Sequence, residues 1–236
     1  MPRITLASFP AELSATNESA ARKAIFFKTV LPLVLQVNEQ IHQDRTRLQA
    51  LAVQQKSHRS LSGVDRLWLA VMAARYGTPR NNISALLSRH DVVPPSLVLA
   101  QAATESAWGT SRFVREGNAM FGEWTFSATQ SGIVPLAREV GKSHRVRAFA
   151  SLRDSIDSYV TNLNKHRAYK EFRAMRRAMR KSGQTLDGMK LAGTLYRYSQ
   201  RGTIYVDGLR ALMTSNNLSR VDGVHLSAEG MIEPLI

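Results

Sequence analysis

The chain has 236 residues, enough for one large domain or for one domain with an arm. Its composition, 44% hydrophobic and 21% charged, is that of a globular protein, and the lack of cysteine excludes disulfides, a thiolate nucleophile and a cysteine-ligated zinc. The formal net charge of +14 indicates either a solvated basic surface or a polyanionic partner, such as nucleic acid, anionic lipid or an acidic envelope polymer.

Residues 1–63 are predicted to form an N-terminal arm and a helical extension that packs on the main domain. Residues 1–17 show little periodicity and are expected to be extended. From residue 18 to residue 55, apolar side chains recur at helical spacing, and Pro32 within this stretch predicts a kink or a break into two helices. The polar segment 55–63 is the best candidate for a boundary or a mobile loop.

The N-terminal region also bears on membrane targeting. Residues 25–37 form the longest apolar stretch, but Lys28 and Pro32 interrupt it and it is too short to span a bilayer. The sequence MPRITLASFP has no basic segment followed by an apolar core and a cleavage site, so no signal peptide is visible. If the protein is exported, this chain is expected to be a mature fragment.

Segment 64–217 is predicted to be the main domain, and 218–236 a tail. Apolar periodicity and Gly, Pro or Asn end signals predict helices over 64–77, 78–91, 91–109, 152–166, 168–183, 185–199 and 203–217. Alternating residues around a short Val-Gly-Lys turn predict a β-hairpin in 131–151. The expected fold class is therefore mainly α (α+β), with one small β-element about midway along the chain.

Several kinds of catalytic site are excluded by motifs that the sequence lacks. The six histidines are scattered without metal-ligand spacing, so neither a metal site nor a cofactor is expected. No nucleophile elbow and no dinucleotide- or phosphate-binding glycine motif occurs, which argues against serine hydrolases and nucleotide-binding proteins. Acid chemistry remains, and Glu105 in QAATESAWGTSRF (101–113) is its natural centre.

Glu105 is a carboxylate among small and aromatic residues. The predicted helix places Gln101 and Glu105 on one stripe, with Trp108 one turn beyond the acid. Near the negative end of the helix dipole and beside an indole, the pKa of this carboxyl is expected to be raised, and a general acid needs such a neutral form. The alternative is a structural glutamate paired with Arg112 or Arg115, which would lower the pKa.

Two ordered stretches carry a resemblance to a known family. The first is AQAATESAWGTSRFVREGNAMFG (100–122), with Glu105, Ser106, Trp108 and Gly109 followed by Asn118, Phe121 and Gly122. The second is YSQRGTIYVDGL (198–209), which contributes Tyr198 and Tyr205. Together they resemble the glucosaminidase family, glycoside hydrolase family 73, and most closely its Bax-type members. The similarity covers roughly residues 64–217, and the phenylalanine-rich stretch 24–40 resembles the Bax-type N-terminal helix.

The resemblance implies a lysozyme-like helical domain with a small β-lobe, and cleavage of β-1,4 bonds next to N-acetylglucosamine in peptidoglycan. Glu105 falls on the general acid of the family. The second carboxylate is expected on the β-lobe, where Glu139 is the candidate, although a solvated hairpin residue would look the same. Glu123 ranks below it. If neither acid reaches the cleft, the substrate's 2-acetamido group or Tyr198 would have to assist.

Four further residues are expected to contact the substrate. Trp108 and Phe121 are predicted to form cleft floor and core together, since sugars pack their apolar faces on aromatic rings. Asn118 either binds the acetamido group or caps a turn. Tyr205 either lines the cleft or is structural, and a core aromatic with a satisfied hydroxyl is the alternative for Tyr198 as well.

The predicted partner is the peptidoglycan glycan strand, and the expected location is the bacterial cell envelope, periplasmic or exported. Peptidoglycan stems carry carboxylates, so the basic helix 173–182 would raise affinity for them in a salt-dependent way, or would be a solvated face. No nucleic acid is expected as a partner, and the oligomeric state is undetermined. A lytic transglycosylase and a non-catalytic basic module that binds cell wall or nucleic acid stay open as alternatives.

Overall fold

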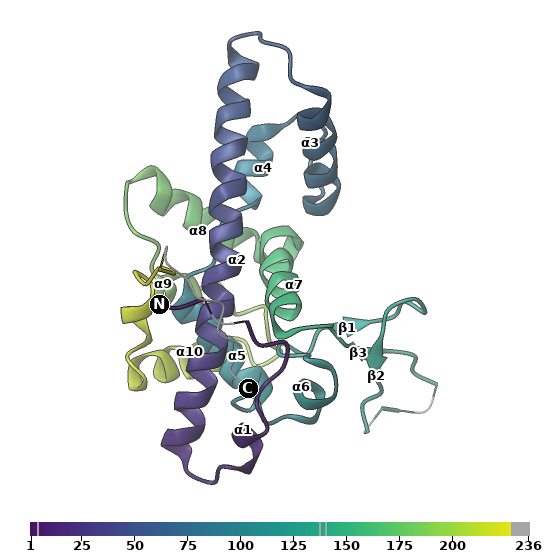
Figure 1. The fold of residues 1–236 in the computed structure, drawn as a ribbon, viewed down its shortest axis with the longest axis vertical. Helices are drawn as coiled ribbons and strands as arrows, with labels where there is room; N and C mark the ends of the chain where they lie inside the picture. Colours follow the sequence, from purple (N-terminus) through teal and green to yellow (C-terminus); the bar gives the residue numbers. More distant parts are fainter. Residues whose placement is uncertain (4, 137, 140, 228–236) are drawn as a thin grey trace.

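The structure is a computed structural model that describes residues 1–3, 5–136, 138–139 and 141–227 (Figure 1). In chain order, its elements are α1 (Glu12–Ala15), α2 (Ser19–Lys56), α3 (Gly63–Tyr76), α4 (Ile83–Arg89), α5 (Pro95–Ser106), α6 (Arg112–Gly117), β1 (Trp124–Thr125), β2 (Gly132–Ile133), β3 (Arg145–Arg147), α7 (Leu152–Lys165), η1 (Arg167–Tyr169), α8 (Lys170–Lys181), α9 (Gly188–Ala192), α10 (Thr203–Ser215) and η2 (Leu218–Val221). The predicted mainly helical fold with a small β-lobe is confirmed. Within these residues, no helix is both long and apolar enough to cross a membrane.

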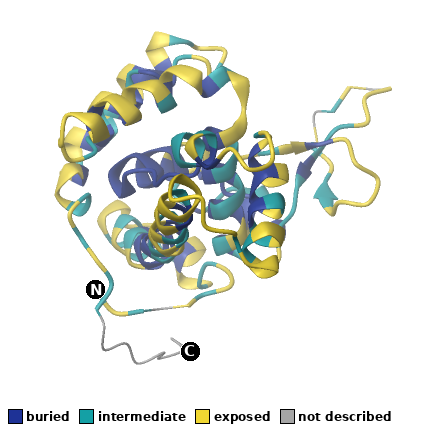
Figure 2. Ribbon diagram, turned by 90° about the horizontal axis from the view of Figure 1, so that it is seen from above, coloured by how far each residue is buried: buried dark blue, intermediate teal, exposed yellow. Residues whose placement is uncertain are grey.

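The main core forms around α5, whose residues 95–103 are all buried. The apolar faces of α2, α7 and α10 pack against it or against one another, and together they form one buried cluster. Figure 2 shows these buried positions gathered in the middle of the molecule, with exposed positions outside. Because α5 is surrounded by other helices, the groups at its two ends are held in fixed places.

Helix α2 is one continuous helix of 38 residues (Figure 1). The predicted break at Pro32 is therefore wrong. A proline inside a helix removes one backbone hydrogen bond and costs about 3 kcal/mol. Here Pro32 lies in the buried stretch 29–35, and packing of that stretch against α5 and α7 compensates for the loss. The predicted division at residue 63 stays a prediction, although α2 shares the core of the main domain.

A second, smaller core joins the C-terminal half of α2 to α3 and α4. Its buried members are Leu48, Leu51, Leu69, Met72, Tyr76, Ile83 and Leu86. The predicted end of α3 at Gly77 is confirmed, with φ of 60° at this residue. The side chain of Asn82 accepts a hydrogen bond from Ala85 N at 2.8 Å, which confirms the predicted cap of α4.

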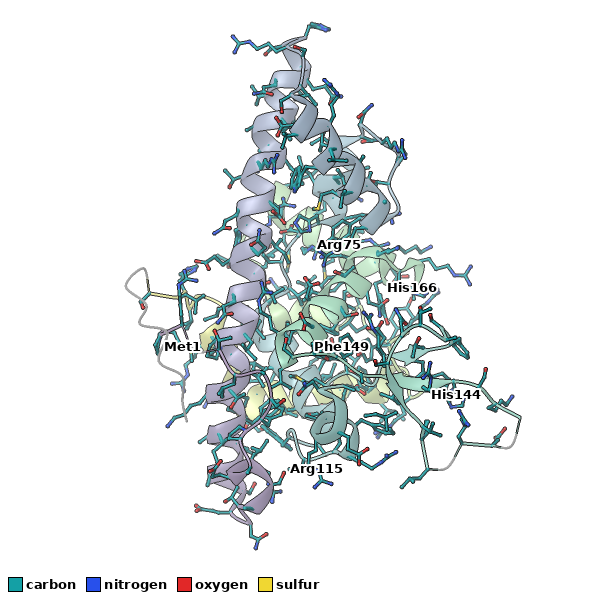
Figure 3. All side chains as sticks on the ribbon, turned by 45° about the vertical axis from the view of Figure 1, so that its right-hand side comes forward. Met1, Arg75, Arg115, His144, Phe149 and His166 are labelled. Atoms are coloured by element: carbon teal, nitrogen blue, oxygen red, sulfur yellow. The ribbon has the colours of Figure 1, made fainter. Side chains whose placement is uncertain are left out.

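The β-lobe is a three-stranded antiparallel sheet of order β1-β3-β2 that projects from the helical body (Figure 1). Strands β2 and β3 pair as the predicted hairpin requires, with Ile133 opposite Val146, but a long loop joins them instead of a short turn. Strand β1 was not predicted because two residues are too few for a periodic signal. Figure 3 shows His144 out on this lobe, where its ring stacks on that of Trp124 at 4.5 Å.

The C-terminal part departs from the prediction in the extent of one helix: the helix expected over 185–199 is shorter and spans Gly188–Ala192. Within the segment predicted as a tail from residue 218, η2 packs on α5 and Asp222 accepts hydrogen bonds from Ser96 N and Oγ, each at 2.8 Å; the boundary at residue 218 stays a prediction. These bonds satisfy an amide at the start of α5, where intrahelical acceptors are missing. The predicted tail from 228 onward lies outside the described residues.

Candidate active site

Glu105 lies in the last turn of α5, one residue before the helix ends at Ser106. The last carbonyl groups of a helix lack intrahelical donors and carry partial negative charge, so this end disfavours a carboxylate anion. Ala107 and Trp108 then adopt left-handed backbone conformations, and Gly109 follows with φ of 79°. A Cβ at Gly109 would come within 2.6 Å of the Leu13 side chain, which explains why this position needs glycine.

Three buried side chains form a chain of hydrogen bonds that ends on the Glu105 carboxyl. Tyr205 Oη donates to Glu105 Oε1 at 2.8 Å, and Gln101 Nε2 donates to Tyr205 Oη at 2.9 Å. Tyr159 Oη in turn donates to Gln101 Oε1. Since α5, α7 and α10 each supply a member, the orientation of Glu105 is fixed by the packing of three helices.

Burial raises the pKa of Glu105 above its usual range, and the hydrogen bond from Tyr205 opposes this rise without cancelling it. By its accessible surface Glu105 is nevertheless an exposed residue, so protein crowds the carboxyl group without covering it. Both observations fit a carboxyl group that is crowded by protein on one side and open to an incoming molecule on the other. The arrangement favours the neutral acid at higher pH than for an ordinary glutamate.

The alternative of an arginine partner for Glu105 is not supported. Arg112 binds Glu116 at 2.9 Å and donates to the carbonyl of Val134 at 2.8 Å. Arg115 lies at the outer edge of α6 and makes no ion pair within the described residues (Figure 3). No cation within the described part of the chain therefore holds Glu105 as an anion.

An aromatic cluster surrounds the acid. The ring of Tyr198 stacks on that of Tyr205 at 5.5 Å with an interplanar angle of 10°, and Phe121 stacks on Tyr159 at 4.0 Å. Burial and the nearby Glu105 carboxyl raise the pKa of Tyr198 well above its usual value, so its hydroxyl stays a neutral donor. In the described structure this hydroxyl makes no hydrogen bond, unlike those of Tyr159 and Tyr205. It is the polar group of the cluster that remains available to a ligand.

Trp108 lies away from the place predicted for it. Helix α5 ends at Ser106 and Trp108 has a left-handed backbone, so Trp108 does not lie one turn further along the helix as predicted. Its indole packs edge-on against Phe26 at 5.5 Å and Phe27 at 5.6 Å, and Lys23 Nζ lies 5.0 Å from the ring centroid. The indole therefore packs the turn after Glu105 against α2. Its contact with substrate stays a prediction.

Asn118 ends α6 in a left-handed conformation, and its amide Nδ2 donates to the carbonyls of Phe149 and Ala150 at 3.2 and 3.3 Å. These bonds join α6 to the foot of the β-lobe, where Figure 3 marks Phe149. Of the two roles predicted for Asn118, the structure shows the one that fixes a turn. Its contact with an acetamido group stays a prediction.

Comparison with known proteins identifies the family of this chain. The family model described as mannosyl-glycoprotein endo-beta-N-acetylglucosaminidase, named Glucosaminidase, matches residues 81–218, more than half of the chain. The chain belongs to the glucosaminidase family. It is also 32% identical over 201 residues to "Protein bax" of Escherichia coli (strain K12), covering 83% of this chain and 70% of that protein. No solved structure matches. Family membership supports a glycosidase-type enzyme.

The two candidates for a second carboxylate in this glucosaminidase domain have different surroundings. Glu123 pairs with Arg147 at 2.9 Å and accepts a hydrogen bond from Ser158 Oγ at 2.6 Å, so both of its oxygens are occupied. Glu139 is exposed on the loop between β2 and β3 and makes no ion pair in the described part of the chain. Residues 137 and 140, on either side of it, lie outside the described residues.

Sequence reasoning missed Gln101 and Tyr159 as supports of the Glu105 side chain. Gln101 lies four residues before Glu105 on the same face of the helix, so its spacing could have indicated that it lies next to the acid. Tyr159 reaches the site from α7, and nothing in the sequence indicates that contact. No group of three or more His, Asp or Glu side chains among the residues described here is placed to hold a metal ion.

Proposed function

We propose that this chain hydrolyses β-1,4 glycosidic bonds next to N-acetylglucosamine in peptidoglycan, with Glu105 as the general acid. It would act in the bacterial cell envelope. The observation that carries the proposal is the environment of Glu105: a helix C-terminus, a raised pKa, a fixed donor from Tyr205 and no cationic partner in the described residues. Membership of the glucosaminidase family supports the choice of glycan.

In the proposed reaction, Glu105 donates its proton to the glycosidic oxygen as the bond between that oxygen and the anomeric carbon breaks. Positive charge develops on the anomeric carbon and the ring oxygen. A water molecule adds to the anomeric carbon, and its proton passes to a second base. The Tyr198 hydroxyl, neutral and without a partner among the described residues, would donate a hydrogen bond to the sugar.

Glu139 is proposed as the second carboxylate because a base must be free to take a proton from water. Glu123 is a poorer candidate, since Arg147 and Ser158 stabilise its charged form. Glu139→Gln is expected to lower the rate of sacculus lysis about tenfold or more, with an unchanged unfolding midpoint. Glu123→Gln is expected to lower the unfolding midpoint of the protein. Full activity of Glu139→Gln would contradict Glu139 as the second carboxylate and would favour assistance by the substrate's acetamido group or by Tyr198.

Tyr205→Phe is expected to move the basic limb of the pH–rate profile upward. The hydroxyl of Tyr205 stabilises the charged form of Glu105, so its loss raises the pKa of the acid further. The control is Tyr196→Phe, which removes an equivalent 2.8 Å hydrogen bond to Glu171 on the exposed surface. If the basic limb for Tyr205→Phe lies at the same pH as for Tyr196→Phe, the coupling between Tyr205 and Glu105 is contradicted.

The test of the proposed function is mass analysis of the products from purified sacculi. A hydrolase leaves fragments that end in reducing N-acetylglucosamine. A lytic transglycosylase needs one acid and no water, and leaves anhydro ends that are lighter by one water. A non-catalytic basic module would release no fragments while binding sacculi, and that outcome would refute the enzyme. Anhydro ends would refute hydrolysis and keep the acid.

A further inference from the structure

A basic pocket of about 640 Å³ lies between α4 and α8, beside the middle of α2. We call it the arginine pocket. Its lining residues are Arg45, Asn82, Ser84, Ala85, Leu87, Ser88, Asp91, Arg176, Arg177, Arg180 and Lys181. Five of these side chains are cationic and one is anionic, so the lining carries a formal charge of +4.

Asp91 is the anion on which three guanidinium groups converge. Arg180 binds its carboxylate through Nε at 3.2 Å and Nη2 at 2.9 Å. Arg45 Nε and Arg176 Nε lie 3.4 and 3.7 Å from the carboxylate oxygens. One negative charge therefore faces three positive charges, and the lining is short of anions before Arg177 and Lys181 are counted.

Part of this positive charge, that of Arg176, is held where water cannot screen it well. Arg176 is 1% exposed, and its guanidinium also donates to the carbonyls of residues 89, 91 and 92. Burial lowers the pKa of Arg176 to about 10; Asp91 opposes this shift, and the neighbouring guanidinium groups reinforce it. An additional anion in the pocket would offset this repulsion.

Several donors of the arginine pocket are free to bind such an anion. Arg177 and Lys181 are exposed and make no side-chain hydrogen bond or ion pair in the described part of the chain. Arg180 uses Nε and Nη2 for Asp91, which leaves Nη1 for another acceptor. Guanidinium and ammonium groups on adjacent turns of one helix suit an oxyanion with several acceptor oxygens.

The arginine pocket is separate from the site at Glu105. Asp91 precedes the first residue of α5, Pro95, whereas Glu105 lies at the other end of the helix. At about 1.5 Å per residue, Pro95 and Glu105 are about 15 Å apart along the axis. Neither Glu105 nor any residue of its aromatic cluster lines the pocket.

We propose that the arginine pocket is a binding site for a multivalent phosphate group, as in pyrophosphate or a phosphate ester. A single carboxylate is already present in Asp91 and leaves the lining strongly cationic. The volume is many times the roughly 30 Å³ that one water molecule occupies, so a group larger than a single small anion fits. The phosphate could belong to a free small molecule or to the headgroup of an anionic lipid.

The test is calorimetric titration of the full chain with pyrophosphate at constant ionic strength, with chloride as the reference salt. Wild-type protein is expected to bind pyrophosphate, and the double variant Arg177→Ala/Lys181→Ala to bind about tenfold or more weakly, because two exposed cations of the lining are lost. The variant should keep its unfolding midpoint, since neither side chain holds the Asp91 cluster together. Lys56→Ala/Arg59→Ala removes the same charge from the exposed end of α2 and the link after it, and should bind as the wild type does.

A second arm distinguishes the sources of the phosphate. Vesicles of phosphatidylcholine with phosphatidylglycerol are compared with phosphatidylcholine alone. If the wild type binds the anionic vesicles and only Arg177→Ala/Lys181→Ala fails to bind them, the ligand is a lipid headgroup. If the wild type binds pyrophosphate but not the vesicles, the ligand is a soluble phosphate. Equal losses in both double variants, or no binding of either probe beyond the chloride reference, would overturn the proposal.

Discussion

Replacement of Glu105 by Gln is expected to lower the rate of sacculus lysis by about 10²–10⁴-fold, the usual contribution of a general acid. The change preserves size and lets the amide oxygen accept the hydrogen bond from Tyr205. It removes the proton that the leaving oxygen needs. The measurement is loss of turbidity of purified sacculi, with co-sedimentation as a separate assay of binding. Unchanged lysis would contradict the assignment of the acid.

The same variant should be as stable as the wild type or more stable. Because burial raises the pKa of Glu105 in the folded state, the folded protein holds this proton more tightly than the unfolded chain does. The charged glutamate therefore costs stability once the pH exceeds the unfolded value of about 4.3. Glutamine carries no charge and removes that cost. A lower unfolding midpoint for Glu105→Gln at neutral pH would indicate a structural carboxylate instead.

Replacement of Asp91 by Asn is expected to lower the free energy of unfolding by about 3–5 kcal/mol. Loss of one partner from a buried ionic cluster leaves the other charges uncompensated, and here three arginines share the single carboxylate. The Asp91 side chain is 5% exposed, so solvent cannot take the place of its carboxylate. Urea denaturation measures the change. Its slope should stay constant if the folded and unfolded states keep their compactness.

Asp157→Asn is the matched control for Asp91→Asn. Asp157 pairs with Arg75 at 2.5 Å on the surface, where both side chains are at least 40% exposed, and such pairs contribute about 0–1 kcal/mol. Burial works against the charge of Asp91, but the arginines outweigh it and lower its pKa. Its contribution is therefore present above an unfolded pKa of about 3.9 and is lost as the pH falls through the folded value. The stability difference between wild type and Asp91→Asn should begin to shrink below about pH 4 and vanish once the pH lies below the folded pKa of Asp91. Equal costs for both variants at neutral pH would contradict this role for Asp91.

The parts of the fold that were predictable are those with strong local signals. Gly77 and Asn82 mark the ends of their helices because their backbone and side-chain preferences act within one turn. The break predicted at Pro32 is absent, because tertiary packing of the buried stretch around it outweighs the tendency of proline to interrupt a helix. Alternating residues in 131–151 were enough to predict the pairing of β2 with β3. Strand β1 has only two residues, so its pairing with the distant β3 defines it and no periodicity marks it.

In the candidate site too, features set by local sequence were predictable and contacts between distant segments were not. The place of Glu105 near a helix end follows from its own sequence, and Gln101 lies on its stripe. The contacts of Tyr205 and Tyr159 depend on how α10 and α7 pack on α5, which local sequence does not determine. The convergence of three arginines on Asp91 likewise joins α2, the start of α5 and α8, and no spacing in the sequence indicates it.

If Glu105 is the general acid, its own titration must control the rate. The direct measurement combines an NMR titration of labelled glutamate carboxyl groups, with Glu105 assigned by the spectrum of Glu105→Gln, and the pH profile of kcat/KM on soluble glycan strands. We expect Glu105 to titrate above the ordinary glutamate value and the basic limb of the profile to coincide with that pKa. A Glu105 that titrates at the ordinary value, or a basic limb at an unrelated pH, would contradict the assignment.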